Sequence, residues 1–244
     1  MKKILMLSLT IATMVLFSAC SKNATPVPPD DPVLLDMYYN EAIRDAIIAD
    51  SSEICDTLLP ISSNNPKLEW RTINNEQYVL VGNYNRFPGS YSDTVVVNYW
   101  GVIWVFIPEQ YKYRMRSATI QNKDTLLRIR QLIGLPPGNT NSYMVELWVK
   151  PRDLFRPATN PAVDTKTSGL YFPAGSDSSH VKWFNQNIYD AYFGMQTHLP
   201  WTRLGYSYDW ARNVPEVGLS EYCIRPNSKL YVKKLVPATR YLDN

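Results

Sequence analysis

The sequence predicts a single α+β domain, built on a mostly antiparallel sheet with about three helices packed against it. From Leu68 onward, short segments rich in β-branched and aromatic residues alternate apolar and polar positions, which is typical of strands. Three other segments place apolar residues at helical spacing. A chain of 244 residues allows one or two domains. Because no linker rich in Pro, Gly or Ser divides 33–244, we expect one α+β domain there.

Three helices are expected, at 33–48, 124–133 and 178–193. The first follows Asp31-Pro32, where Asp can cap the helix and Pro suits its first position. The second stops at Gly134, a residue type that is common just beyond a helix end. The third begins at Ser178 or Ser179, either of which can act as its N-cap.

Strands are expected at 68–73, 77–84, 93–107, 143–149 and 204–210. Asn74-Asn75 lies between the first two and is typical of a hairpin turn. The run 93–107 is the most hydrophobic stretch after the N-terminal segment, and it predicts a central strand, or two strands with a bend at Gly101. Its Trp100 and Trp104 are expected to belong to the core.

The N-terminus has the pattern of an export signal. Lys2 and Lys3 precede an apolar stretch, 4–17, and small residues then lead to Cys20. A membrane-spanning helix needs ~20 apolar residues, so this stretch is short for one. The run Leu16-Phe17-Ser18-Ala19-Cys20 resembles the end of the signal in bacterial lipoprotein precursors.

That resemblance implies cleavage of a signal peptide (1–19) and lipidation of Cys20, which would anchor the chain in a membrane. Ser21 follows the cysteine, which in that family implies sorting to the outer membrane, facing either the periplasm or the cell surface. Residues 20–32 contain four prolines and almost no large apolar side chain, so we expect an extended tether.

The net charge of the sequence bears on the kind of partner that the protein could bind. Loss of 1–19 removes two of 25 Lys and Arg residues against 22 Asp and Glu, leaving a net charge of +1. No clustered basic face is visible, so a nucleic-acid partner is not expected.

With Cys20 lipidated, Cys55 and Cys223 remain; in an oxidising compartment they form either a disulfide or two buried free thiols.

Familiar catalytic and cofactor motifs are missing from the sequence. The two histidines, His180 and His198, have no nearby Cys or His companion, so no metal site is expected. No GxSxG, Walker or GxGxxG motif occurs, and no cofactor is expected. His198, close to Trp201, is a candidate general base, although a lone His of this kind more often makes an ordinary surface hydrogen bond.

The segment 199–221 concentrates aromatic and ionisable residues more tightly than any other. Within it Leu204, Tyr206, Tyr208 and Trp210 alternate with Arg203, Gly205, Ser207 and Asp209, which predicts one aromatic and one polar strand face. Either the polar face is simply solvated, or Gly205 lets a ligand approach the backbone. The second interpretation makes Arg203, Ser207, Asp209 and Trp201 the candidate ligand-binding residues.

Glu221 is the strongest single candidate for a catalytic residue. The run from Glu221 through Pro226 to Val232 resembles the last catalytic strand of ADP-ribosyltransferase-like proteins, in which a Glu precedes a Pro-containing turn and another strand. The resemblance implies that Glu221 would orient the ribose of NAD. Leu219 stands where that family has a second acidic residue. Glu216 and Glu221 could alternatively form an acid/base pair for glycoside hydrolysis.

The aromatic content favours binding over catalysis. The chain has 17 Tyr and 7 Trp, side chains that stack on sugars or peptides while offering a polar handle; the same residues could simply line the core. We therefore predict a membrane-anchored envelope lipoprotein that acts as a non-catalytic binding module for a glycan or a protein partner. The alternative is an enzyme of glycosyl-transfer, ADP-ribosyl-transfer or glycan-hydrolysis type that uses Glu221 and Arg203.

Overall fold

The protein is described by a computed structural model that covers residues 30–117, 124–194 and 197–243. The predicted lipidation site Cys20, the signal peptide (1–19) and most of the tether (20–32) lie outside the described residues. Within them, no helix is long and apolar enough to cross a membrane.

The described strands form one nine-stranded sheet in the order β3-β9-β5-β2-β4-β8-β6, with β1 paired to β2 and β7 to β8. All the strand pairs are antiparallel. This confirms the predicted α+β class. The strands are β1 (Trp70–Ile73), β2 (Glu76–Asn85), β3 (Val95–Val97), β4 (Ile103–Phe106), β5 (Tyr143–Val149), β6 (Leu154–Phe155), β7 (Tyr206–Tyr208), β8 (Val217–Ile224) and β9 (Lys229–Pro237).

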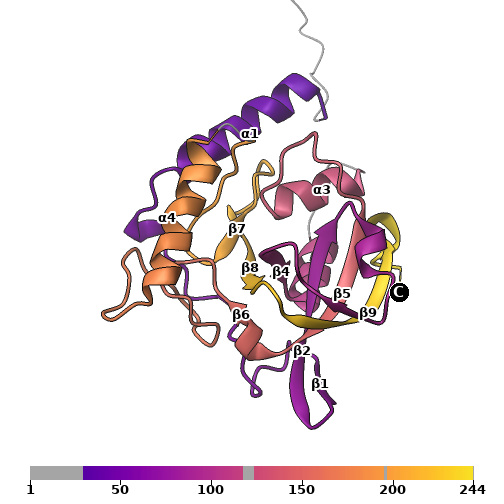
Figure 1. Ribbon diagram of the computed structural model, residues 1–244. Coiled ribbons are helices and arrows are strands. Elements are labelled where there is room, and N and C mark those ends of the chain that lie inside the picture. The colour runs from indigo at the N-terminus through magenta and orange to yellow at the C-terminus, as the bar shows by residue number, and fades with distance from the viewer. Residues whose placement is uncertain (1–29, 118–123, 195–196, 244) are drawn as a thin grey trace, which may run out of the picture.

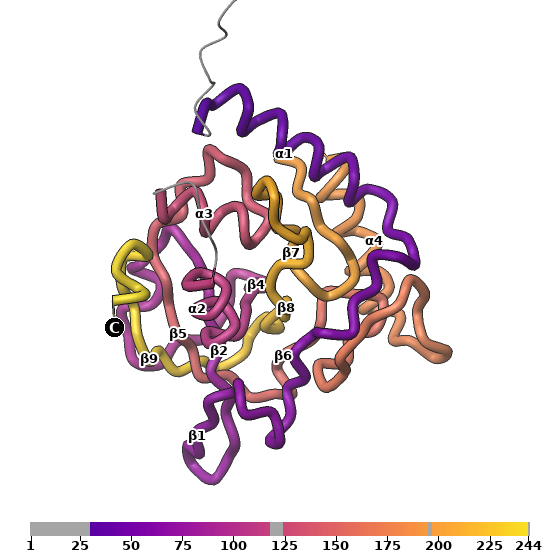
Figure 2. The backbone as a smooth tube through the Cα atoms, turned by 180° about the vertical axis from the view of Figure 1, so that it is seen from behind, coloured from indigo at the N-terminus to yellow at the C-terminus, as the bar shows by residue number. Residues whose placement is uncertain are grey.

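Four α-helices are present in the described chain: α1 (Pro32–Ala46), α2 (Pro108–Ser117), α3 (Thr125–Leu132) and α4 (Ser178–Tyr192). Figures 1 and 2 show α1 beside α4 along one side of the molecule, with α2 and α3 on the other side of β7 and β8. The helix α2 is not among the expected helices, because its Arg and Lys residues interrupt the apolar spacing that marks the other three.

Successive side chains of each strand point to opposite faces of the sheet, and both faces are buried. One face packs Val81, Val105, Leu147 and Tyr222 against the segment from Leu59 to Leu68, which has no α-helix. The other face packs the residues between these, including Phe106 and Leu219, against α2 and α3. The helices thus gather on one face of the sheet, and the buried aromatic side chains of α4 join that layer beside Trp104.

Local signals placed most element boundaries. Asp31 caps α1, because its Oδ1 accepts hydrogen bonds from the amides of Val33 and Leu34 at 2.9 and 3.2 Å. At the β1–β2 turn, Asn74 and Asn75 adopt φ values of 50° and 63°, which Asn tolerates better than most residues. The cap of α4 was predicted wrongly: its N-cap is Asp177, since Ser178 already lies inside the helix.

The hydrophobic run 93–107 forms two strands rather than one. Gly101, with φ of 113°, lies between β3, at the edge of the sheet, and β4, near its centre. Trp100 next to this bend is 52% exposed, so the prediction that it belongs to the core is wrong. Trp104 is half-buried.

The two remaining cysteines are free thiols in the structure, so of the two alternatives left open it contains the unbridged one. Cys223 lies on β8 and is buried, and burial raises the pKa of its thiol well above the usual range. Cys55 is half-buried and packs beside Leu58, Leu204 and Tyr206.

Candidate ligand-binding pocket

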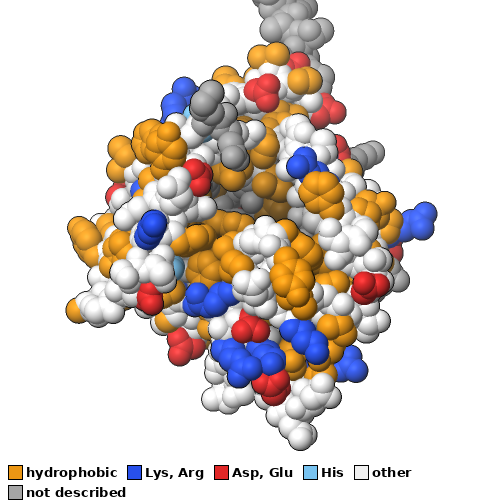
Figure 3. Space-filling view, viewed as in Figure 1, with side chains coloured by type: hydrophobic (Ala, Val, Ile, Leu, Met, Phe, Trp, Pro, Cys, Tyr) orange, Lys and Arg blue, Asp and Glu red, His pale blue; other side chains and the backbone are white. Residues whose placement is uncertain are grey.

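A cavity of about 840 Å³ lies where the central strands meet the ends of α3 and α4. Its walls come from the C-terminal half of β2, the segment 100–106 that contains β4, the residues after α3, the segment 197–201 and the strands β7 and β8. Figure 3 shows a hollow at the centre of one face of the molecule, with hydrophobic side chains on its walls. Its volume lies within the range of small-molecule sites, about 300–1,000 Å³.

The cavity lies where two central strands of the sheet share little backbone pairing. Strands β2 and β5 pair over seven positions, from Val79–Val149 to Asn85–Tyr143. In contrast, the register between β2 and β4 holds the single pair Gly82–Phe106 within these described strands. Beyond that pair the Asn83 side chain, which donates to the carbonyl of Trp104, joins the two strands, and side chains of both strands line the cavity.

Gly82 is required at this junction by the ring of Phe106. A Cβ added at position 82 would lie 2.6 Å from Phe106 Cε2, which is far inside contact distance. The ring therefore lies over the backbone of β2, and it stacks on Tyr111 of α2 with ring centroids 5.2 Å apart. The position of this ring fixes one wall of the cavity.

Aromatic side chains form most of the remaining wall. Trp104 and Trp201 meet edge to face with centroids 5.9 Å apart, and Tyr91 and Trp100 do the same at 5.9 Å. Edge-to-face pairs of this kind hold both rings in place. The aromatic residues that line the cavity are Tyr84, Phe87, Tyr91, Trp100, Trp104, Phe106, Trp201 and Tyr208.

Glu221 lies in the middle of β8, directly opposite Phe106 of β4, and its side chain lines the cavity. The residue is half-buried, but its Oε2 atom is shielded from solvent and has no hydrogen-bond partner. Burial raises the pKa of Glu221 to about 8, although the nearby Arg156 guanidinium opposes the shift. At neutral pH this carboxyl therefore holds a proton in most molecules.

Other polar atoms around the cavity also lack partners. Asn83 donates from Nδ2 to the carbonyl of Trp104 at 2.9 Å, which leaves its Oδ1 unpaired. Asn85 Nδ2 and Trp201 Nε1 are likewise buried without a partner. Buried polar groups are nearly always hydrogen-bonded, so these three atoms and Glu221 Oε2, like nine others elsewhere in the described residues, are free to bond to water or to a bound molecule.

Three of the residues singled out from the sequence meet at this cavity: Trp201, Ser207 and Glu221. Ser207 contributes structure as well, since its hydroxyl donates to the carbonyl of Leu132 at 2.8 Å and accepts from the amide of Leu219 at 2.9 Å. Ser207 thus ties β7 to α3 and β8, and it is 3% exposed.

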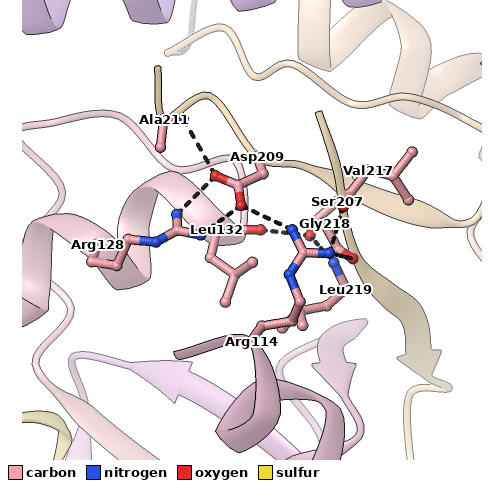
Figure 4. Close-up of polar contacts among 9 residues, drawn as sticks. All are labelled: Arg114, Arg128, Leu132, Ser207, Asp209, Ala211, Val217, Gly218 and Leu219. Atoms are coloured by element: carbon pink, nitrogen blue, oxygen red, sulfur yellow. Dashed lines mark hydrogen bonds and ion pairs between the residues drawn. The ribbon is translucent and has the colours of Figure 1, made fainter. Parts of the chain in front are cut away.

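Asp209 does not line this cavity, and it is not on a solvated face. Its carboxylate is buried and accepts two hydrogen bonds from Arg128, at 2.7 and 2.6 Å, and one from Arg114 at 3.2 Å (Figure 4). Arg114 lies on α2 and Arg128 on α3, so Asp209 joins both helices to the segment after β7. This arrangement gives Asp209 a structural role in place of the ligand-binding role considered from the sequence.

Arg203 and His198 are likewise not among the residues that line the cavity. Arg203 has φ of 63°, and its guanidinium donates to the carbonyl of Ala46 at 2.9 Å and lies over the ring of Tyr192. His198 is exposed, with Nε2 3.1 Å from the carbonyl of Gly194. An enzyme that uses Arg203 beside Glu221 therefore lacks geometric support.

Gly205 has a different role from the one proposed from its sequence context. A Cβ at this position would lie 2.7 Å from Cδ of Arg156, so the space beside Gly205 is filled by an arginine side chain and not by a ligand.

Glu216 lines a second hollow of about 390 Å³ with Asp45 and Glu41, separate from Glu221. The two glutamates therefore do not form the acid/base pair considered from the sequence.

Several residues of the cavity were missed because their partners are distant in the sequence. Trp100 and Trp104 were expected in the core, and Asn83 lies inside a strand that reads as uniformly buried. An Asn among the apolar residues of a central strand was the available signal, because it has to find partners for its amide.

Among the described residues, no group of three or more His, Cys, Asp or Glu side chains is placed to hold a metal ion. The cavity can enclose an organic molecule, with aromatic walls for its body and the carboxyl of Glu221 for a polar group. Comparison of the chain with protein-family models, with curated proteins and with solved structures finds no match.

Proposed function

We propose that this protein is an exported, lipid-anchored binding module whose central cavity holds a small organic ligand. The observation that carries the proposal is the cavity of about 840 Å³, in which aromatic walls surround unpaired buried polar atoms. Non-polar walls with a few placed polar groups are the usual composition of ligand sites. The export signal and Cys20 would place this site in the cell envelope, at the outer membrane.

The size and depth of the cavity favour a small molecule, or one residue of a glycan, over a broad protein interface. Protein partners usually bury large, nearly flat surfaces of about 800 Å² on each side. Here the aromatic residues surround a hollow. Trp201 lines this hollow although it is only 5% exposed.

A catalytic use of the same cavity is the second candidate, and one observation favours it. A carboxyl with a pKa of about 8 can donate or accept a proton near neutral pH, which is the property of a general acid or base. Asp190 is the other carboxylate among the described lining residues, and it accepts from Gln186 on the exposed side of α4. Turnover of a bound ligand that is lost in E221Q, with binding retained, would identify an enzyme.

The binding proposal is tested with the mature chain by intrinsic fluorescence and thermal shift against small sugars, amines, organic acids and nucleotides. Because Trp100, Trp104 and Trp201 line the cavity, a bound ligand is expected to change the emission and to raise Tm. Ser90→Trp would fill the mouth and abolish both effects, whereas Ser92→Trp, two positions away and outside the lining, would not. Absence of any response from every class would overturn the proposal.

A further inference from the structure

The described lining of the cavity has two carboxyl side chains and no basic side chain. Its ionisable carboxylates are Glu221, inside, and Asp190, near the exposed surface of α4. Among the described residues that line it there is no Lys, Arg or His. An anionic ligand such as a phosphate ester or a carboxylate would therefore enter a site with no positive group to hold it.

Arg156 does not fill the role of counter-ion. It is fully buried, and its guanidinium donates to five backbone carbonyls at 3.1 to 3.4 Å, those of Leu59, Ala162, Val163, Thr165 and Gly205. Its charge also lies over the ring of Tyr222, on the opposite face of β8 from Glu221. Its guanidinium donates to backbone carbonyls and not to Glu221, and Glu221 Oε2 is left without a partner.

The acceptors in the cavity are suited to a donor-rich group. Glu221 Oε2 and Asn83 Oδ1 are both unpaired oxygen atoms. Both atoms belong to residues that line the cavity, but from opposite faces of the sheet: Glu221 shares a face with Phe106 and Gly82, and Asn83, the next residue after Gly82, leaves the strand on the other face. An ammonium group carries up to three donors and a positive charge, so it could satisfy Glu221 Oε2 and replace the proton that Glu221 otherwise holds.

The aromatic walls favour the same charge. The faces of Trp, Tyr and Phe rings attract cations, and the effect is strongest for Trp in sites shielded from water. Trp104, Trp201 and Phe106 line the same cavity as the carboxyl, and Trp100, which also lines it, is 52% exposed. Trp201 Nε1 and Asn85 Nδ2 remain as unpaired donors for a hydroxyl or carbonyl elsewhere on the ligand.

We propose that the cavity selects an organic cation: an amine with an apolar or aromatic body, whose ammonium group pairs with Glu221 inside the aromatic walls. The inference rests on the proposed binding function and adds the chemical class of the ligand. It distinguishes this cavity from a nucleotide or sugar-phosphate site, either of which requires cationic side chains.

Three probes with one shared body test the charge preference: 2-phenylethylamine, 2-phenylethanol and phenylacetate, titrated into the mature protein by calorimetry. We expect the amine to bind about tenfold or more tightly than the alcohol, which corresponds to about 1.4 kcal/mol, and phenylacetate to bind most weakly. Equal or tighter binding of the alcohol or of phenylacetate would overturn the inference while leaving the binding function in place. Failure of all three to bind would count against both.

Two matched variants assign the preference to one carboxyl. Glu221→Gln is expected to lower the affinity for the amine to about that for the alcohol, a loss of about tenfold, while the alcohol binds as before. Asp190→Asn removes the other acidic side chain of the cavity and should change the affinity for the amine by less than about twofold, because exposed charges are screened by water and salt. A loss in D190N equal to that in E221Q would contradict the assignment.

Discussion

Glu221 sits between Leu219 and Cys223 on the face of β8 that points toward the helices. The low polarity of its surroundings disfavours the charged form, and this is why its pKa rises from 4.5 to about 8. A raised carboxyl pKa means that the folded state binds a proton which the unfolded state has already lost. The associated stability is complete below pH 4.5 and declines as the pH rises towards 8.

Glu221→Gln should remove this dependence on pH. Each unit of pKa shift corresponds to about 1.4 kcal/mol, so the free energy of unfolding of the wild type should fall relative to that of E221Q by about 2 to 4 kcal/mol between about pH 5 and pH 9. Urea denaturation of both proteins across that range measures the difference. Two curves that run parallel would show that Glu221 has an ordinary pKa.

Asp209 is a buried polar residue that stabilises the fold. Removing one partner of a buried, hydrogen-bonded ion pair leaves the other charge uncompensated, which typically costs about 3 to 5 kcal/mol. We expect Asp209→Asn to destabilise the protein by roughly this amount, because Arg128 is almost fully buried beside it. The matched control is Glu41→Gln, which breaks the exposed pair with Arg212 and should cost less than about 1 kcal/mol. Similar losses of Tm in both variants would contradict the assigned role.

At the scale of elements, the junction of β2 with β4 decides whether the cavity exists. A methyl group at position 82 would collide with the ring of Phe106, and a collision of this kind in a packed core costs about 1 to 3 kcal/mol. Gly82→Ala should therefore lower stability and shift Phe106, which alters one wall of the site. Gly89→Ala is the control, because a Cβ there meets no atom within 4 Å.

The readouts for this pair are the free energy of unfolding and the affinity for 2-phenylethylamine. Both should fall in G82A and remain close to the wild type in G89A. If G82A keeps full stability and binding, the ring of Phe106 is not confined as the structure indicates.

The elements that local signals specify were predicted well. The helices α1 and α3 and the strands β1, β2 and β5 follow from capping residues, turn residues and periodicity, all of which act over a few positions. Three failures stand out: the helix α2, whose face is short and interrupted; the strands β6, β8 and β9, which were not among the strands expected from periodicity; and the segment 204–210, of which three residues form β7. In this last segment the alternating pattern is real, but both of its faces are buried, so neither can be identified as solvated.

At the scale of the whole molecule, the predicted anchor makes a separate test possible. If Cys20 carries a diacylglycerol and its new amine is acylated, the mature N-terminal peptide will show the corresponding mass, and the protein will fractionate with the outer membrane. Cys20→Ala should leave the protein unprocessed at this site and without lipid. An N-terminal peptide with an unmodified Cys20 thiol would rule the anchor out.

The sequence by itself determined the α+β class, the first and second helices and the strands bounded by turn residues, because these depend on neighbours within a few residues. It also singled out Glu221, Ser207 and Trp201 as residues of interest. The tertiary structure alone decided that these three share a cavity with Asn83, Trp100 and Trp104, and that Asp209 and Arg203 serve the fold. The reason is physical: the burial of Glu221 and its missing partner arise from chain segments more than a hundred residues apart, and no local pattern records such contacts.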